Sequence, residues 1–512
     1  MIKTKTMHTV LFALFPLFFL AANNIEQISI DALILPVVII LLLYRTAGHL
    51  FGFVFKNSEK KAILLSFCIL IFFSYVHFYS LISRFELNGF TIARNQDGMI
   101  AYALFFVLVS CPLLKLTVKR AKNITPALNY IALALVSISL FNIAAYEINH
   151  FMAFGEKSNE NKVLFNESLE VPEVAPDIYY IILDRYAPSS TLKEYYGYDN
   201  SKFIEYLTDK GFYIANESLA NYPKTHLSLA SSLNMKHLLY LSEMLGENSK
   251  DTNIANNMMK DHKVWGLLKE KNYTFIHFGT WWEPTRKNEY ADININYYAL
   301  EMNEFHKELL KTTAIYPFIN KILFKKEQWT RELYKFDQLE EMPEIEEPKF
   351  VFAHFLVTHD PYSFTREGDL LENTGQNEKE LYIEQVIFLE KKLRFLTDAL
   401  ISKSERPVII ILQSDEGPFT PEFGEHGGAG IDWTTLSDES LQVHMRIFNA
   451  IYIPQNDKKI FYNELSPVNS FRIIFNEYFN ANYSLLNDRS YIFEDLQYPY
   501  NYIDITEKVI YH

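Results

Sequence analysis

The sequence predicts two unlike parts: a polytopic α-helical membrane domain over residues 1–150, and an α/β domain with a mainly parallel sheet over residues 176–512. Three observations support this division. Five long apolar runs all lie before residue 150. The charge balance is +6 over residues 1–150 and −20 over the rest, although the 512-residue chain carries −14 as a whole. After residue 176, short apolar runs alternate with longer helical patterns.

The composition excludes several classes of protein. Aromatic residues make up 15% of the chain, which is more than a disordered chain contains. The 62 acidic residues outnumber the 48 basic ones, and this excess repels a phosphate backbone, so we expect no nucleic-acid partner. The two cysteines, Cys68 and Cys111, fall inside apolar runs. The part after residue 150 therefore has no disulfides to stabilise it and depends on its core.

The apolar runs cover residues 9–22, 32–45, 62–83, 99–117 and 127–146. A bilayer core needs a helix of about 20 residues, and the last three runs reach that length alone. The second run could be extended by the apolar residues of 50–55. Helices of a soluble domain are normally amphipathic, but these runs have almost no polar face. We therefore expect about five membrane spans.

The basic residues between the runs predict the orientation. With the N-terminus in the cytoplasm, the inner segments contain ten Lys and Arg residues, and the outer loops contain only Arg84 and Arg94. Cytoplasmic loops show this bias. Five spans then end outside, so the large domain is expected on the extracytoplasmic side, after a polar juxtamembrane linker at 151–175. Alternatively, the first run is a signal peptide cleaved near Ala21-Ala22, which changes the number of spans but not this side.

In the second part, four apolar runs are predicted as strands buried on both faces: Ile178–Leu183, Phe275–Phe278, Phe350–Leu356 and Val408–Leu412. Amphipathic patterns predict helices at Ser201–Lys210, His262–Lys271, Asn296–Lys311 and Glu378–Ser402. Alternation of this kind is typical of an α/β domain with a mainly parallel sheet. In such sheets, ligands bind beyond the carboxyl ends of the strands.

Polar residues are found at or after the ends of the predicted strands. Taken singly, Asp184 and Thr225 could be capping residues, and His354 and Trp282 could be core positions. Their coincidence at one edge of the sheet favours a site. The candidates are Asp184, Thr225, Trp282, Arg286, His354, His359, Asp415, Glu416 and His426.

These residue types support one chemistry. Asp184, Asp415 and Glu416 can together bind a divalent cation through oxygen, and such ligation favours Mn²⁺ or Mg²⁺ over Zn²⁺. A threonine hydroxyl becomes a nucleophile when a bound metal lowers its pKa. Nearby histidines and an arginine could hold the oxygens of a phosphoryl group or protonate a leaving group.

With these motifs the chain resembles the alkaline-phosphatase/sulfatase superfamily, and within it the membrane-anchored branch of lipoteichoic acid synthases and lipid A phosphoethanolamine transferases. The resemblance covers nearly the whole chain. It implies that Asp184 in ILDRY binds the metal and that Thr225 in KTHLS is the nucleophile and a further ligand. Asp415 and Glu416 in SDEGP match the metal pair of a DHG motif. The implied substrate-binding residues are His359 in HFLVTHDP, His426, Trp282, Arg286 and His354.

Two departures from the family pattern are informative. Glu416 stands where a histidine is usual, so its direct ligation of the metal is in question. The exported domain has no Cys-x-Pro-x-Arg motif, so formylglycine cannot form and a true sulfatase is not expected.

The resemblance implies a membrane-bound, metal-dependent phosphotransferase. It would move a phospho-head group, of the phosphoglycerol or phosphoethanolamine type, from a lipid donor through a phospho-threonine to an envelope glycan or lipid. One alternative is a phosphodiesterase, phosphatase or sulfatase-like hydrolase on the same site. Another is a catalytically silent envelope scaffold, which Glu416 in place of histidine keeps open. The expected location is the cell membrane, multi-pass, with the C-terminal domain outside.

Overall fold

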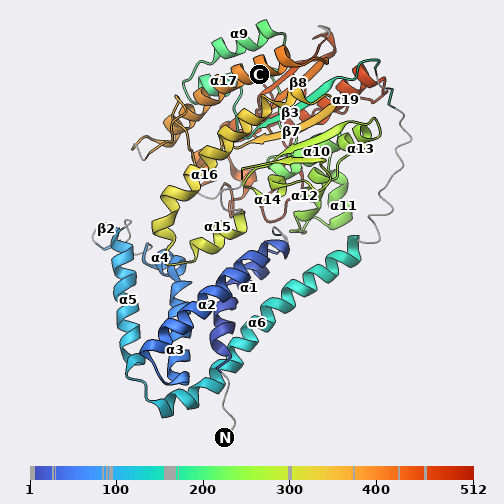
Figure 1. Cartoon of the computed structure of the whole chain (residues 1–512). Helices are drawn as coiled ribbons and strands as arrows, with labels where there is room; N and C mark the ends of the chain where they lie inside the picture. Colours follow the sequence, from blue (N-terminus) through green and yellow to red (C-terminus); the bar gives the residue numbers. More distant parts are fainter. Residues whose placement is uncertain are drawn as a thin grey trace. The chain divides into compact units, whose positions relative to one another are not determined.

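The structure is a computed structural model, and it describes residues 6–25, 28, 30–83, 86–87, 90–91, 96–154, 169–170, 172–297, 303–372, 375–424, 427–454 and 458–511. The chain forms two compact units (Figure 1). Unit 1 comprises Met1–Val163 and Glu301–Phe324, and unit 2 comprises Leu164–Leu300 and Lys325–His512. Unit 1 thus includes a segment that lies far along the sequence from its other residues.

Unit 1 is helical, and the predicted apolar runs fall largely on its helices; residues 115–117 of the fourth run lie beyond the helix that ends at Leu114. The helices are α1 (His8–Asn23), α2 (Ile34–Val54), α3 (Ser58–Phe72), α4 (Tyr75–Ser83), α5 (Gln96–Leu114) and α6 (Val118–Phe154). A short hairpin, β1 (Glu86–Leu87) and β2 (Phe90–Thr91), lies between α4 and α5. Large apolar side chains stay exposed on α2 and α6, among them Leu42, Phe53, Ile138 and Phe141. Such surfaces suit lipid rather than water.

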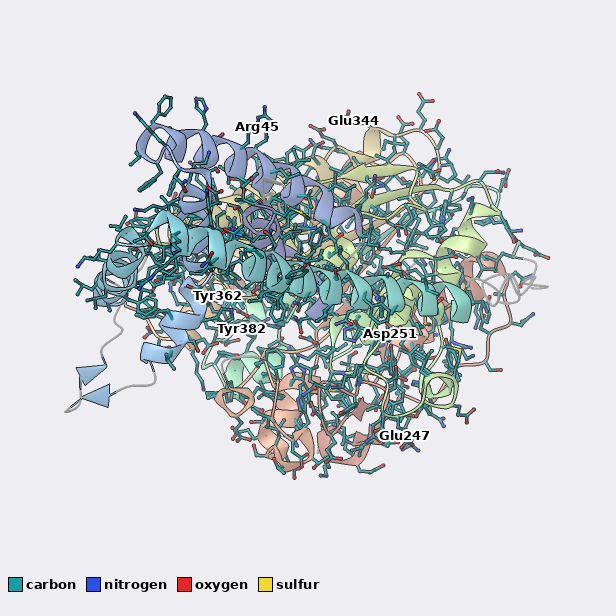
Figure 2. The ribbon with its side chains drawn as sticks, turned by 90° about the horizontal axis from the view of Figure 1, so that it is seen from below. Arg45, Glu247, Asp251, Glu344, Tyr362 and Tyr382 are labelled. Carbon is teal, nitrogen blue, oxygen red and sulfur yellow. The ribbon has the colours of Figure 1, made fainter. Side chains whose placement is uncertain are left out.

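The prediction of five spans is supported only in part. Among the described residues, two helices are long and apolar enough to cross a bilayer: Ile30–Val54 and Val118–Ile148. A third is obtained if α3 and α4, which bend by 55°, count as one span. Helix α1 and the apolar stretch Ala101–Ser110 are shorter. Arg45, one of the basic residues used to predict the orientation, is exposed on α2 (Figure 2).

The late segment of unit 1 has its own short helix, α15 (Glu304–Lys311). It begins with a reciprocal cap between Asn303 and His306. Phe305 and Leu309 are buried in a cluster of apolar residues from α1, α2, the chain between them and α6. His306 Nε2 also lies 2.8 Å from the carbonyl oxygen of Ala32. The helix predicted over Asn296–Lys311 therefore starts later than expected.

Unit 2 contains a seven-stranded mixed sheet in the order β4-β9-β8-β3-β7-β5-β6. The strands are β3 (Asp177–Leu183), β4 (Tyr213–Ile214), β5 (Thr274–Phe278), β6 (Ile293–Ile295), β7 (Lys349–Phe355), β8 (Val408–Gln413) and β9 (Asn449–Tyr452). The neighbours β8, β3, β7, β5 and β6 are parallel, whereas β9 is antiparallel to β8. All four predicted strands are confirmed to within one residue at each end.

Helices cover both faces of the sheet (Figure 1). Apolar residues of α9 (Ser201–Lys210), α16 (Tyr316–Leu339) and α17 (Glu378–Lys403) pack in one cluster with alternate residues of β3, β7 and β8. On the other face, Phe471 of α19 (Pro467–Phe479) packs edge-on against Tyr180 of β3. On that face, Trp265 of α13 (Lys263–Lys269) packs against Phe275. The predicted helices at 201–210 and 378–402 are confirmed.

The strand register brings three strand ends to one place. Ile182 of β3 pairs with His354 of β7 on one side and with Gln413 of β8 on the other. Asp184 and Asp415 each follow two residues after a member of this row. The carboxyl edge of the sheet thus gathers the residues that the sequence singled out.

The burial of Glu390 on α17 predicts that the free energy of unfolding depends on pH. It is only 6% exposed, and burial raises its pKa to about 7, although Tyr186 and Tyr198 donate hydrogen bonds to it. A raised folded-state pKa stabilises the fold fully below the unfolded value of about 4.5, and this contribution is lost as pH rises through 7. We expect it to amount to about 3 kcal/mol. Glu390→Gln should flatten the decline in melting temperature between pH 5 and pH 8; parallel curves for the two proteins would contradict this.

Candidate metal centre and active site

Three buried side chains meet at the carboxyl edge of the sheet. Asp184 follows β3, His354 lies near the end of β7, and Asp415 follows β8. One ligand atom from each lies within 4.8 Å of those of the other two. His354 Nε2 is 3.1 Å from Asp184 Oδ2. The group has the spacing of a metal centre.

The described residues balance only part of the negative charge of this group. Asp184 Oδ1 and both carboxylate oxygens of Asp415 are buried and make no hydrogen bond of normal geometry with the described part of the chain. Burial raises the pKa of Asp184 to about 6 and that of Asp415 to about 8, and the negative charge of Glu416 adds to both shifts. Three buried carboxylate oxygens without a hydrogen bond, on two neighbouring aspartates, fit a divalent cation.

The donor set differs from the one expected, because His354 contributes a nitrogen. A set of two carboxylates and one imidazole suits Zn²⁺ as well as Mn²⁺. The predicted preference for Mn²⁺ or Mg²⁺ assumed ligation by oxygen alone, and a nitrogen ligand weakens it.

Hydroxyl groups hold the three residues in place. His354 Nδ1 lies 3.1 Å from Thr285 Oγ1, which in turn lies 2.8 Å from Thr280 Oγ1. When Nδ1 donates to Thr285, Nε2 is left with the lone pair that a metal requires. The hydroxyl of Thr358 donates to the carbonyl of Asp184. Ser228 donates to the carbonyl of Asp415 at 2.8 Å.

Thr225 is the first residue of α10 (Thr225–Asn234) and is half-buried. Its hydroxyl lies beside the carboxyl group of Asp415 and lowers the pKa of that group against the opposing effect of burial. The helix N-terminus favours negative charge at this position. Because Ser228 of the same helix binds the backbone of Asp415, α10 is joined directly to the end of β8.

Glu416 lies outside this group of three. Its Oε1 accepts a hydrogen bond from Arg185 Nε at 3.2 Å. Burial opposes ionisation of Glu416, but the charges of Lys224, His444 and Arg185 outweigh burial and lower its pKa. Asp415 and Glu416 both lie in the bend that follows β8, and of the two only Asp415 belongs to the group of three.

Arg185 links four acidic or aromatic groups. Its Nη1 donates to Asp360 at 2.8 Å, its Nε lies 3.7 Å from Asp184 Oδ1, and its guanidinium carbon lies 4.4 Å from the centre of the Phe419 ring. Its φ of +58° is in the left-handed region, at a cost of roughly 1–2 kcal/mol for a non-glycine residue. Tyr382 supports this backbone, because its hydroxyl donates to the carbonyl of Arg185.

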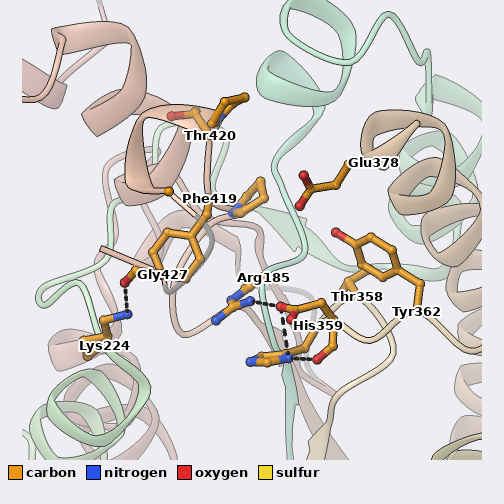
Figure 3. Close-up of a pocket in the computed structure, with 13 residues that line it drawn as sticks. Arg185, Lys224, Thr358, His359, Tyr362, Glu378, Phe419, Thr420 and Gly427 are labelled. Atoms are coloured by element: carbon orange, nitrogen blue, oxygen red, sulfur yellow. Dashed lines mark hydrogen bonds and ion pairs between the residues drawn. The ribbon is translucent and has the colours of Figure 1, made fainter. Parts of the chain in front are cut away.

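A cavity of about 520 Å³ opens beside these residues (Figure 3). Lys224 Nζ lies 3.1 Å from the carbonyl oxygen of Gly427 and 4.3 Å from the centre of the Phe419 ring, and burial lowers its pKa to about 8. Tyr362 on the cavity wall packs edge-on against Tyr382. Residues that line the cavity include Arg185, Lys224, His359, Asp360, Tyr362 and Phe419.

The remaining predicted residues are distributed as follows. His359 lines the cavity, its Nδ1 donates to the carbonyl of Asp360, and its ring lies edge-on to Trp281 at 5.8 Å. Trp282 packs edge-on against His354 at 6.3 Å, so it contacts a candidate ligand. Arg286 Nε lies 3.1 Å from Glu283, and it is not among the residues that line the described cavity. His426 lies outside the described residues.

Four further residues build the site and were not among the candidates predicted from the sequence: Arg185, Lys224, Thr285 and His444. Each of the first three is adjacent in sequence to a residue that was singled out. His444 of α18 (Asp438–Met445) gave no local signal. Its ring nitrogens face the carbonyl oxygens of Gly417 and Pro223 at 3.0 and 2.9 Å. It therefore fixes the turn after Glu416 against the segment that leads to Thr225.

Fold and site together define an α/β domain, joined to a helical membrane unit, with a candidate metal centre at the carboxyl edge of its sheet. No known family model matches the chain, and no curated protein matches its sequence. Solved structures do. The C-terminal periplasmic domain of EptC from Escherichia coli is 12% identical, with 66% of this chain and 95% of that chain covered and a TM-score of 0.43.

The integral membrane lipooligosaccharide phosphoethanolamine transferase A of Neisseria meningitidis is 11% identical, with 91% of this chain and 94% of that chain covered and a TM-score of 0.39. A protein in the alkaline phosphatase superfamily from Vibrio parahaemolyticus is 11% identical, with 64% of this chain and 74% of that chain covered and a TM-score of 0.37. These neighbours are of the superfamily and the membrane-anchored branch that the motifs resemble. All three TM-scores are below 0.5.

Proposed function

We propose that the chain is a membrane-bound, metal-dependent phosphotransferase. It moves a phospho-head group, of the phosphoglycerol or phosphoethanolamine type, from a lipid donor through a phospho-threonine on Thr225 to an envelope glycan or lipid. One observation carries the proposal: Asp184, His354 and Asp415 form a buried group with the spacing of a metal centre, and the hydroxyl of Thr225 lies beside it at a helix N-terminus.

Asp184, His354 and Asp415 would hold the divalent cation, with Thr225 as a further ligand. When bound, it would lower the pKa of the Thr225 hydroxyl and offset negative charge on the phosphoryl group. Glu416, expected from the sequence as a ligand, acts through Arg185 in this proposal. The support is its hydrogen bond with Arg185 and its place outside the group of three.

In the first half-reaction, Thr225 Oγ attacks the phosphorus atom of the donor. The bond from phosphorus to Oγ forms as the bond to the lipid alcohol oxygen breaks; Thr225 loses its hydroxyl proton and the departing alcohol gains one. Arg185 and Lys224, both on the cavity wall, hold the non-bridging oxygens. The backbone N–H groups at the start of α10 add partial positive charge.

In the second half-reaction, His359 acts as the base. Because Nδ1 donates to a carbonyl, Nε2 of the neutral ring is an acceptor. Burial and the charge of Arg185 lower the pKa of His359, which keeps the ring neutral near pH 7. Nε2 takes the proton of the acceptor hydroxyl, whose oxygen attacks phosphorus. The bond from phosphorus to Thr225 Oγ breaks, His359 releases its proton, and Oγ regains the proton it lost in the first half-reaction. Trp282, Arg286 and His426 are proposed, from the resemblance alone, to contact the rest of the substrate.

The membrane part of the proposal has five spans, with the N-terminus inside and unit 2 on the extracytoplasmic side. The ten basic residues of the inner segments against Arg84 and Arg94 in the outer loops support this orientation. A lipid donor suits a site that is attached to the bilayer.

The test is incubation of the full-length protein with labelled phosphatidylglycerol or phosphatidylethanolamine and either Mn²⁺ or Zn²⁺. We expect diacylglycerol to appear, and its yield to rise when a glycan acceptor is added. Release that does not depend on the acceptor would replace transfer with hydrolysis. No release from either lipid, in a protein that also binds no metal, would favour a silent scaffold.

Glu416→Gln separates the two roles for Glu416. The variant keeps the shape but removes the charge that Arg185 binds. We expect its metal dissociation constant to stay within about threefold of the wild type, and its KM for the lipid to rise about tenfold, because Arg185 loses its partner. Metal content by elemental analysis and steady-state kinetics would check this. A loss of metal like that of a ligand variant would make Glu416 a ligand instead.

A further inference from the structure

Helix α16 presents a buried polar face to the sheet edge that carries His354. Within its unit 2 part, Glu327, Gln328, Arg331, Glu332 and Lys335 are each 6% exposed or less. Their spacing of three and four residues puts them along one side of the helix. Buried ion pairs contribute little more stability than apolar side chains of the same volume. Core packing alone therefore gives no reason for four charged residues at these positions.

Three of these side chains bind the backbone around the end of β7. Lys335 Nζ donates to the carbonyl of His354 and lies 3.1 Å from Glu332 Oε1. Glu332 Oε2 accepts from the backbone N–H of Leu356 at 3.3 Å. Gln328 Nε2 donates to the carbonyl of the same Leu356 at 3.1 Å.

The sheet does not supply these bonds. The pairing of β5 with β7 ends at Ala353, one residue before His354. Beyond it, side chains of α16 take the place of a neighbouring strand. Arg331 serves the next segment in the same way, because its Nε donates to Asn296 Oδ1 and its Nη2 to the carbonyl of Tyr297, both just after β6.

We propose that Gln328, Glu332 and Lys335 are positioning residues for the metal centre. They fix the backbone of His354 while Thr285 fixes its ring, so Nε2 is held at the site before a metal arrives. Metal affinity then depends on α16, although none of its described side chains is one of the three ligands. This inference rests on the proposed metal centre and goes beyond the assignment of its ligands.

The chain offers a matched control at the opposite end of the same strand. Lys349, the first residue of β7, is fully buried and pairs with Asp177 at 2.5 Å. Lys335→Met and Lys349→Met each remove a buried ammonium group and leave one buried carboxylate unpaired. Only the first does so at the edge of the sheet that carries the ligands.

The experiment measures the Zn²⁺ and Mn²⁺ dissociation constants of the full-length protein by competition with a chelator, and the melting temperature of the metal-free protein. We expect both variants to lower the melting temperature. Lys335→Met should weaken metal binding about 10- to 100-fold, as loss of a group that orients a ligand does, and Lys349→Met less than about twofold. Lys335→Arg, which keeps a donor, should recover part of the affinity.

If Lys335→Met does not fold, Gln328→Met replaces it in the test, because this variant leaves no charge unpaired. We expect Gln328→Met to weaken metal binding by about three- to tenfold. Equal affinity losses in the two lysine variants, or unchanged affinity in Lys335→Met and Gln328→Met, would overturn the positioning role. A wild-type protein that binds neither metal would instead overturn the metal centre itself.

Discussion

Thr225→Ala is expected to reduce release of the lipid alcohol by on the order of 10⁴-fold or more, and to abolish labelling of the protein by the phospho-head group. The alanine lacks the oxygen that attacks phosphorus. The nearest hydroxyl on the same helix face, that of Ser228, is bound to the carbonyl of Asp415. Mass spectrometry of the protein after brief exposure to the lipid would detect the phospho-threonine.

Two variants complete this test. Thr225→Ser keeps the hydroxyl and should retain measurable activity and labelling. Thr225→Ala should keep its metal, because Asp184, His354 and Asp415 remain. Alcohol release by Thr225→Ala at the wild-type rate would mean that water attacks the donor directly and that no covalent intermediate forms.

Asp415→Asn is expected to lower the metal affinity but to raise the stability of the metal-free protein at high pH. Metal affinity should fall by more than about 100-fold, because a charged ligand is lost rather than a group that only orients one. The metal-free variant should melt at a higher temperature than the wild type above pH 8, since a buried charge beside Asp184 has been removed.

The sign follows from the pKa of Asp415, which burial and the charges of Asp184 and Glu416 raise to about 8. Its protonated form stabilises the metal-free fold below the unfolded value of about 3.8, and this stabilisation is lost as pH rises through 8. Melting curves at pH 6 and pH 8.5, with and without chelator, would check it. A variant less stable than the wild type at pH 8.5 in chelator would contradict the prediction.

The central strands could be predicted because a strand buried on both faces needs a continuous apolar run, and β3, β7 and β8 have one. The strands β4, β6 and β9 could not. They are two to four residues long, lie at or near the edges of the sheet, and carry no pattern that distinguishes them from loops. Helix length also explains why the prediction of five spans is supported only in part, because α1 has the composition of a span but only 16 residues.

The site could be predicted only as a set of strand ends. His354 has the apolar neighbours of a core residue, and only the pairing of β3 with β7 brings its ring to Asp184. The separation of Asp415 from Glu416 depends on which way each side chain points, which sequence adjacency does not determine. His444 contacts Pro223 across 221 positions of the chain, so its role depends on the tertiary fold.

The membership of residues 301–324 in unit 1 has a consequence for producing unit 2 by itself. A protein that begins at residue 164 still carries this segment. Phe305 and Leu309 would then lose the apolar cluster that buries them, and newly exposed apolar surface promotes self-association. The truncated protein would be less soluble because of apolar surface exposed more than a hundred residues away from the point of truncation. A soluble, monodisperse unit 2 therefore requires a second excision, around α15, in addition to removal of the N-terminal helices.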